Sequence, residues 1–536
     1  MPVLLVDDKT KDVACHPAKP AAELRQHSTG QRLLATLQKP VVFLPILTFA
    51  ALLVHGYHPY VDDAAIYLAG IEKVIHPSLF PLHAEYVLPH LRHSLFSFAL
   101  GWMIRGLHFR LTYALFATYL VSLWLMLYSC WRLTCILFTG TRARWGAMLL
   151  ITATLTLPVA GSAIFFMDPY LTARSFSTPA TLLAITFTLE RRTLATVLCL
   201  AAAFVLHPLM AGYAVGYVIA LVLLQQERWK GLAALAGVVL VFGAAGSHAG
   251  KLLGNSPAYQ IAAISRSYFF LDHWAWFEVF GLFPPLIAAL IFWARQGFQL
   301  RSNYSRVAAA SLYVGVLALL FAVLFARTDS SFLLARLQPL RAFQLIYILF
   351  FLLLGSIVGE RILRGNWLAW TACFAVIAGI MLTAQLYIYP SLAHVEWPGS
   401  KSRNPWEQAF LWIRDNTPRN ALFALNPHYQ QQPQEDTVGF RATAQRSVLA
   451  DWNKDGGVAA IYPAVAQEWW KQVTTTQDFS SWTDRQRVQA LAPYHVTWIV
   501  LPSASTTGFY CPYENSAVRV CKLPSESASF SPLAHR

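Results

Sequence analysis

Long apolar runs separated by short polar breaks occupy most of the chain from residue 40 to residue 390. A helix that crosses the hydrocarbon of a bilayer needs about 20 apolar residues. Two of the runs, 178–190 and 193–207, are short enough to form a re-entrant pair instead of two full crossings. A further stretch at 94–107 is short and carries Arg105, so we expect it to lie in the interface. The pattern predicts 11 membrane-spanning helices, at 41–57, 112–138, 145–163, 178–190, 193–207, 209–225, 231–246, 274–294, 307–326, 341–358 and 367–389.

Basic residues cluster in alternate polar breaks, which predicts how the helices are oriented. Pairs such as Arg142 and Arg144, or Arg191 and Arg192, fall on the same side as the basic N-terminal tail 1–38. Positively charged loops stay in the cytoplasm, so the tail is predicted to be cytoplasmic. An odd number of spans then places residues 391–536 outside the cytoplasm. The loops predicted on that outer face are 58–93, 166–177, 247–273 and 327–340.

The chain changes character after residue 390, where apolar runs give way to a polar segment. Asn404 followed by Pro405 predicts the start of a helix over 404–412. Short apolar strands separated by helical stretches predict a small α/β domain over 391–536. Cys511 and Cys521 flank a turn and suit a disulfide if this domain faces an oxidising compartment. The strands and hairpin are predicted at 421–425, 496–501 and 509–523.

Composition supports the membrane interpretation and removes one alternative. Of the 536 residues 56% are hydrophobic and only 13% are charged, against about a quarter in a soluble protein. The fold class predicted is therefore a polytopic α-helical membrane protein, with residues 39–390 forming the transmembrane domain. The net charge of +14 does not indicate a nucleic-acid partner, because the basic residues follow the topology rule. No zinc-finger spacing, basic helix or phosphate-binding Gly-rich loop accompanies them.

The first external loop, 58–93, begins with two adjacent carboxylates, Asp62 and Asp63. An Asp ahead of Ala64–Leu68 is a plausible helix cap, because its carboxylate accepts hydrogen bonds from free N–H groups. Two acids in succession exceed what a cap needs, so we expect one to be a general base for a hydroxyl acceptor. The two roles are compatible, with Asp63 as the cap and Asp62 as the base. The loop also contains Glu72, His76, His83, Glu85, His90, Arg92 and His93.

Further candidate residues lie in the other external loops. Asp168 is either the start of an Asp-Pro turn or a third carboxylate in the same cleft, with Arg174 close behind it. Arg341 and Arg266 suit a lipid phosphate through their guanidinium groups, although a snorkelling anchor is the simpler interpretation of such residues.

The histidines of the first loop allow two interpretations. His90 and His93 are three residues apart and could share a helix face, with His83 and Glu85 near them, which is loosely typical of a ligand set. Pro89 interrupts this spacing, and no strict zinc motif is present. Hydrogen-bonded histidine is the commoner case. A substrate-binding role for His83, Glu85 and His93 therefore stays a prediction.

The chain resembles the GT-C superfamily of membrane glycosyltransferases, in a bacterial branch. The resemblance is carried by Tyr60-Val61-Asp62-Asp63 after the first span, by Met167-Asp168-Pro169-Tyr170 after the third, and by Trp412–Pro418 with Ala421–Phe423 in the external domain. It implies a multi-pass protein of the inner membrane that takes a sugar from a polyprenyl-phosphate donor. A loop-1 Asp would act as the base, with inversion at the anomeric carbon, and a basic group or divalent metal would steady the leaving phosphate.

The sequence departs from the commonest patterns of that superfamily. It has Asp-Asp where some relatives have Asp-Glu, and the second acidic loop lacks a further acid spaced by one residue. The metal requirement is therefore open. Two other functions stay open as well: a transporter or flippase for a lipid-linked or polar solute, which should place charges near the bilayer midplane, and a non-catalytic membrane scaffold.

Overall fold

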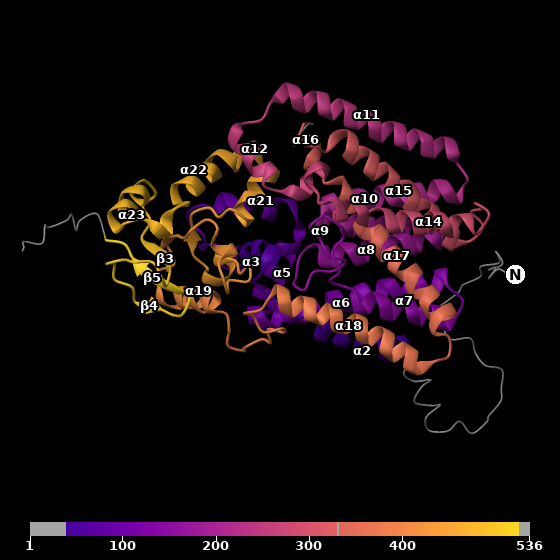
Figure 1. Cartoon of the computed structure of the whole chain (residues 1–536), viewed down its shortest axis with the longest axis horizontal. Helices are drawn as coiled ribbons and strands as arrows, with labels where there is room; N and C mark the ends of the chain where they lie inside the picture. The colour runs from indigo at the N-terminus through magenta and orange to yellow at the C-terminus, as the bar shows by residue number, and fades with distance from the viewer. Residues whose placement is uncertain (1–38, 330–331, 525–536) are drawn as a thin grey trace, which may run out of the picture.

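The computed structural model describes residues 39–329 and 332–524, and the expected cytoplasmic tail 1–38 lies outside them. A helical bundle occupies one end of the molecule, and a mixed domain formed by the C-terminal segment occupies the other (Figure 1). Residues 58–107, which include α3 (Asp62–Ile75) and α5 (Leu95–Leu107), lie between the two.

Each of the 11 apolar runs forms a helix. Within the described residues, seven helices are long and apolar enough to cross a membrane. This confirms a multi-pass helical protein, but the number 11 is not confirmed, because α2, α7, α8 and α9 are shorter. The bundle helices are α2 (Pro40–His55), α6 (Leu111–Leu137), α7 (Thr141–Ala153), α8 (Arg174–Leu189), α9 (Thr193–Leu206), α10 (Pro208–Gln225), α11 (Trp229–Leu253), α13 (Trp276–Gly281) with α14 (Phe283–Ala294), α15 (Asn303–Phe325), α17 (Phe343–Ile357) and α18 (Trp367–Ile388).

One predicted span differs clearly from the structure. The run 145–163 was expected to be helical throughout, but α7 ends at Ala153. Pro158 has no N–H to donate and disfavours helix in the residue before it, which is consistent with an end at this point. The chain then doubles back, and Pro158 forms a β-bridge with Phe165.

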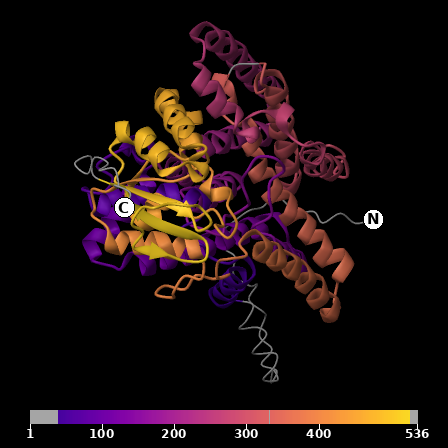
Figure 2. The ribbon, with the colours of Figure 1, turned by 60° about the vertical axis from the view of Figure 1, so that its left-hand side comes forward.

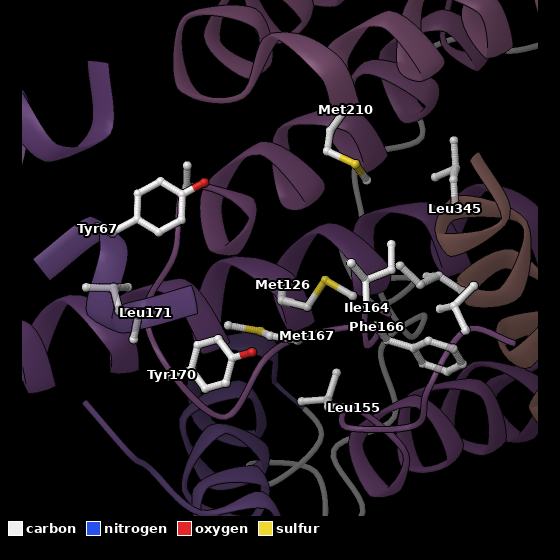
Figure 3. Close-up of a cluster of buried hydrophobic side chains, with 14 of the residues drawn as sticks. Tyr67, Met126, Leu155, Ile164, Phe166, Met167, Tyr170, Leu171, Met210 and Leu345 are labelled. Carbon is white, nitrogen blue, oxygen red and sulfur yellow. The ribbon is translucent and has the colours of Figure 1, made fainter. Parts of the chain in front are cut away.

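The loop that follows α7 is held by its own apolar side chains. Ile164, Phe166 and Met167 are buried and belong to the cluster drawn in Figure 3, beside Met126 of α6. The ring of Phe166 lies 5.0 Å from that of Phe351 on α17. This packing fixes the backbone immediately before Asp168.

The predicted first external loop and the stretch that follows it form a compact segment of short helices. The predicted interfacial stretch is α5, whose 13 residues are too few to cross about 30 Å of hydrocarbon at 1.5 Å per residue. Ser94 caps it by accepting a hydrogen bond from the N–H of Phe96 at 3.2 Å. The elements are α3 (Asp62–Ile75), η1 (Ala84–Tyr86), α4 (Leu88–His93) and α5 (Leu95–Leu107).

Short helices also occupy the other connections between bundle helices. They are α12 (Pro257–Ile264), η2 (Ser267–Phe269), η3 (Leu271–His273), α16 (Phe332–Ala335), η4 (Pro339–Ala342) and η5 (Val358–Leu363).

The C-terminal segment contains the predicted helix, strands and disulfide. Asn404 caps the helix α19 (Pro405–Asn416), accepting from the N–H groups of Trp406 and Glu407. The sheet has the order β2-β1-β3-β5-β4, with β1 parallel to β2 and β3, and β5 antiparallel to β3 and β4. A disulfide joins Cys511 to Cys521. The strands are β1 (Leu422–Ala424), β2 (Ser447–Val448), β3 (Trp498–Pro502), β4 (Tyr513–Glu514) and β5 (Val518–Lys522).

Figure 2 shows the sheet with helices beside it. The C-terminal segment contains, besides α19, the helices α20 (Phe440–Ala444), α21 (Lys454–Ile461), α22 (Ala466–Thr476) and α23 (Asp484–Leu491), with the short turns η6 (Tyr429–Gln431), η7 (Pro463–Val465), η8 (Phe479–Ser481) and η9 (Ala492–Tyr494).

The C-terminal segment interlocks with the start of α3. Val61 forms an antiparallel bridge with Val438, and the N–H of Asp62 donates to the carbonyl of Thr437 at 3.1 Å. A Cβ on Gly439 would lie 2.1 Å from the Cβ of Ala65, so this approach requires glycine. The C-terminal segment therefore takes part in placing the acidic pair.

Candidate active site

A cavity of about 520 Å³ lies where α3, α4, the bundle ends nearest the C-terminal segment and α21 meet. Both members of the acidic pair line it, from the first turn of α3. The predicted residues that line the cavity are Asp62, Asp63, Arg174, Arg266, Arg341 and His93. Six residues from five separate places in the sequence thus surround one space.

Asp62 has a strained backbone and two hydrogen-bond donors. Its φ of 45° is in the left-handed region, which costs a non-glycine residue about 1–3 kcal/mol and is commonest at functional sites. The hydroxyl of Tyr389 donates to Oδ2 at 3.1 Å, and the ammonium of Lys454 contacts Oδ1 at 3.1 Å. Neither Asp62 nor Asp63 is the N-cap residue, which is Val61 and has no side-chain cap bond. The side chain of Asp62 is 31% exposed, so a ligand can reach it.

Asp63 and Asp168 share Arg174. The Nη2 atom of Arg174 lies 3.0 Å from an oxygen of each carboxylate, and its Nε also donates to Asp168 at 3.2 Å. Arg174 and Asp168 are almost completely buried, whereas the side chain of Asp63 is 35% exposed. Asp168 lies behind Arg174 and does not line the cavity, so the three predicted acids are connected, but only two face the same space.

The environments of these two carboxyl groups differ. Burial alone would raise the pKa of Asp63, but Arg174 and Lys454 outweigh it and hold that pKa well below its usual range. Burial raises the pKa of Asp168 despite Arg174, and the charge of Asp63 adds to the rise. Asp63 is therefore a firmly ionised partner of Arg174, with little tendency to accept a proton.

Lys454, at the start of α21, is the site residue that the sequence did not suggest. Its Nζ lies 3.1 Å from Asp62 and 3.8 Å from Asp63. Burial lowers the pKa of Lys454, but the two carboxylates more than compensate and raise it, which keeps the ammonium charged. A Lys in a polar turn has no local signal that would connect it to acids almost 400 residues earlier.

The two predicted phosphate-binding arginines have different partners. Arg266 donates from Nη1 to the carbonyl of Asn453 at 2.9 Å and from Nη2 to that of Trp452 at 2.6 Å. Arg341 donates from Nε to the carbonyl of Ser162 at 3.3 Å and lies over the ring of Tyr268. Arg266 thus supports the backbone beside Lys454. The terminal nitrogen atoms of Arg341, on the cavity wall, have no hydrogen-bond partner within residues 39–329 and 332–524.

The predicted residues of the first loop separate into two places. His93 lies on the cavity wall, where its Nδ1 is 2.7 Å from the carbonyl of Pro89 and 3.1 Å from the hydroxyl of Tyr462. His83 contacts Glu85 at 3.0 Å and Gln472 of α22 at 3.1 Å. Neither His83 nor Glu85 lines the cavity. Their contacts connect the first loop to α22 and do not place them beside the acids.

Two polar atoms of the cavity wall lack partners in the described part of the chain. They are Oε1 of Gln338 and Nδ1 of His90, both buried. Gln338 is 3% exposed and also has a left-handed φ of 47°. A buried polar group without a hydrogen bond costs about 1–3 kcal/mol, so these atoms suit a polar ligand.

The acidic residues do not fit a divalent metal ion. Magnesium and calcium bind through several carboxylate and carbonyl oxygens, but the oxygens of Asp62 and Asp63 face Tyr389, Lys454 and Arg174. Over residues 39–329 and 332–524, no group of three or more His, Cys, Asp and Glu side chains is arranged to hold a metal. The positive charge beside the acids comes from an ammonium and a guanidinium group.

Comparison with known proteins gives one family match and several similar structures. The model of a domain of unknown function, DUF6798, matches residues 404–475, which include Lys454. The match covers a small part of the chain and does not assign the whole chain to a family. No curated protein matches the sequence.

The similar structures include the Archaeoglobus fulgidus oligosaccharyltransferase in three forms. The form tethered to an acceptor peptide has a TM-score of 0.47 at 12% identity, covering 88% of this chain and 70% of that one. The oligosaccharyltransferase AglB in complex with an inhibitory peptide and a dolichol-phosphate has a TM-score of 0.46 at 12% identity, covering 87% of this chain and 69% of that one. The apo form has a TM-score of 0.43 at 13% identity, covering 87% of this chain and 69% of that one.

Proposed function

We propose that this protein is a membrane glycosyltransferase of the GT-C type, which moves a sugar from a polyprenyl-phosphate donor to an acceptor hydroxyl on the extracytoplasmic face. The observation that supports it most is a partly exposed carboxylate, Asp62, on the wall of a cavity that also contains Arg341. The cavity adjoins the outer ends of the apolar helices, where a lipid-linked substrate would present its headgroup. The disulfide between Cys511 and Cys521 supports an oxidising, extracytoplasmic location for the C-terminal domain.

Asp62 is the better base of the acidic pair. A general base must lie within hydrogen-bonding distance of the proton that it takes. Asp63 is bonded to Arg174 and has a lowered pKa, so protonating it is unfavourable. Asp62 has no bond to Arg174, and its exposed fraction leaves room for an acceptor.

The proposed transfer is a single displacement at the anomeric carbon of the donor sugar. The acceptor hydroxyl gives its proton to the carboxylate of Asp62, and its oxygen forms a bond to the anomeric carbon of the sugar. The bond from that carbon to the phosphate oxygen breaks, and the electron pair leaves with the polyprenyl phosphate. Attack opposite the leaving group inverts the anomeric carbon.

Arg341 is the proposed partner of the leaving phosphate. Guanidinium groups bind phosphate oxygens through two parallel hydrogen bonds, and such contacts are strongest where water is excluded. Arg341 is 9% exposed and is oriented through Nε, so its terminal nitrogen atoms can meet the phosphate. Gln338 and His90 supply the unpartnered polar atoms described above for the sugar hydroxyls.

A transfer assay with purified protein tests this proposal. Labelled polyprenyl-phosphate sugars are incubated with the protein in lipid nanodiscs together with candidate acceptors, and product formation and release of polyprenyl phosphate are both measured. Asp62→Asn should reduce transfer by about 10²- to 10⁴-fold, the usual contribution of a general base. Asp415→Asn is the control, since Asp415 is 62% exposed and pairs only with Arg414 at the surface. Transfer by Asp62→Asn at the parent rate would refute the assigned base.

A further inference from the structure

We propose that Lys454 takes the place of a divalent cation at the acidic pair, so that the transferase site works without a metal ion and only while the C-terminal domain is docked. This inference rests on the proposed function for its activity measurements, but its binding measurement is independent of them. It concerns a side chain that no comparison assigns to a site.

The position of the ammonium group is the first argument. Lys454 Nζ lies 3.1 Å from Oδ1 of Asp62 and 3.8 Å from Oδ1 of Asp63, so one cation faces both carboxylates. The side chain is 18% exposed and lines the cavity. A metal ion bridging the two acids would need these oxygens and would be repelled at contact distance by the ammonium.

Charge balance is the second argument. Three carboxylates, Asp62, Asp63 and Asp168, meet two fixed cations, Arg174 and Lys454. Without Lys454 the exposed acids would keep only the guanidinium that Asp63 shares with Asp168. The ammonium therefore lowers the cost of holding two adjacent acids in a partly buried site.

The rigidity of the turn that carries Lys454 is the third argument. The carboxylate of Asp451 accepts from the N–H of Lys454 at 2.5 Å and from that of Asp455 at 3.2 Å. Arg441 in turn binds both oxygens of Asp455, at 2.6 and 2.7 Å. These hydrogen bonds hold the backbone of Lys454 in one position. Its ammonium group is therefore held beside the two acids, unlike that of a lysine on a flexible surface turn.

The bundle side also contributes to this turn. Arg266, from the connection between α12 and η2, donates to the carbonyls of Trp452 and Asn453, the two residues before Lys454. The position of Lys454 therefore depends on the contact between the C-terminal domain and the external loop. Undocking the domain would remove the cation from the acids.

Manganese binding is the decisive measurement, because it does not require a known donor or acceptor. Electron paramagnetic resonance of added Mn²⁺ is recorded for the full-length protein, for Lys454→Met and for Lys454→Met combined with Asp63→Asn. We expect the parent to leave Mn²⁺ free, Lys454→Met to bind it, and the combined variant to leave it free again. Lys454→Arg should exclude Mn²⁺ as the parent does, and Lys471→Met on α22 is the matched control. Melting curves show which variants are folded, and Lys454→Gln replaces Lys454→Met if the latter is not.

The two possible contrary results are distinct. If the parent binds Mn²⁺ and Asp63→Asn abolishes the binding, the site holds a metal and the proposal is overturned. If folded Lys454→Met and Lys454→Gln both leave Mn²⁺ free, Lys454 is not the group that excludes it, and the proposal is equally overturned.

Activity gives a second readout wherever the parent shows transfer. We expect the chelator EDTA to leave transfer by the parent unchanged, and Lys454→Met to lose about 10²-fold, with recovery in Lys454→Arg. Loss of parental activity in EDTA that Mn²⁺ restores would contradict the inference while leaving the glycosyltransferase proposal intact. Absence of transfer in every protein would instead contradict the proposed function, and the Mn²⁺ measurement would still decide the role of Lys454.

Discussion

Replacing Arg174 by Met should destabilise the protein strongly, because Arg174 neutralises a buried carboxylate. Arg174 makes two hydrogen bonds to Asp168, and the two side chains are 5% and 4% exposed. Removing one member of a buried ion pair costs about 3–5 kcal/mol, since the other charge stays buried without a partner. The bond to Asp63 adds little to this figure, because the side chain of Asp63 is about a third exposed and screened by water. We therefore expect Arg174→Met to cost about 3–5 kcal/mol in the free energy of unfolding.

A double-mutant cycle measures the same pair directly. Unfolding in mixed micelles, followed by tryptophan fluorescence, is compared for Arg174→Met, Asp168→Asn and the combination of the two. The combined variant should be more stable than the sum of the single effects predicts, by about 0.5–3 kcal/mol, because the uncompensated charge is gone. Arg414→Met is the control, and loss of its surface contact to Asp415 should cost about 0–1 kcal/mol. Strict additivity, or a cost for Arg174→Met no larger than that of the control, would refute the ion-pair reasoning.

Three further outcomes follow from contacts outside the acidic pair. Burial, reinforced by Glu396, raises the pKa of Glu407 to about 8. The folded state then binds a proton between about pH 4.5 and 8 that the unfolded state has lost. The stability of the parent therefore falls as the pH rises through that window. The melting temperature of Glu407→Gln, which cannot lose this proton, should rise relative to that of the parent as the pH increases from about 4.5 to 8. A difference in melting temperature that does not change with pH would contradict this. Arg266→Ala should speed hydrogen–deuterium exchange of the backbone around Lys454, and unchanged exchange would show that Arg266 does not hold that turn. Cys511→Ser should lower the free energy of unfolding by about 2–4 kcal/mol and make the melting temperature insensitive to reductant. If reductant does not change the melting temperature of the parent either, the disulfide is contradicted.

The elements of the fold that depend on local pattern were predictable from the sequence. Each predicted apolar run contains a helix, since hydrophobic continuity over many residues leaves a membrane-buried backbone few alternatives. The cap at Asn404 and the strands β1, β3, β4 and β5 also follow from short-range signals, whereas the two-residue strand β2 (Ser447–Val448) was not predicted. The end of α7 at Ala153 was missed, because the apolar run continues past the point where Pro158 interrupts the helix.

The acids of the site were predictable, but their partners were not. Asp62, Asp63 and Asp168 are conspicuous as charges beside apolar runs, so the sequence alone draws attention to them. Lys454 and Tyr389 reach Asp62 only because the chain folds back over more than 300 residues. The sequence suggested that Arg266 binds phosphate. In the structure its guanidinium group donates to the backbone carbonyls of Trp452 and Asn453, a contact between distant parts of the chain that no local pattern predicts.

The difference between Asp62 and Asp63 shows why these long-range contacts determine the chemistry. The two residues are identical, adjacent and both in the first turn of α3, but Asp62 has a left-handed φ and Asp63 does not, and their carboxylates meet different partners. Asp63 meets Arg174, which keeps its proton affinity low, whereas Asp62 meets a phenol and an ammonium at the cavity wall. The C-terminal domain therefore sets the surroundings of Asp62, because it supplies both the cation beside the carboxylate and the backbone carbonyl that accepts from its N–H.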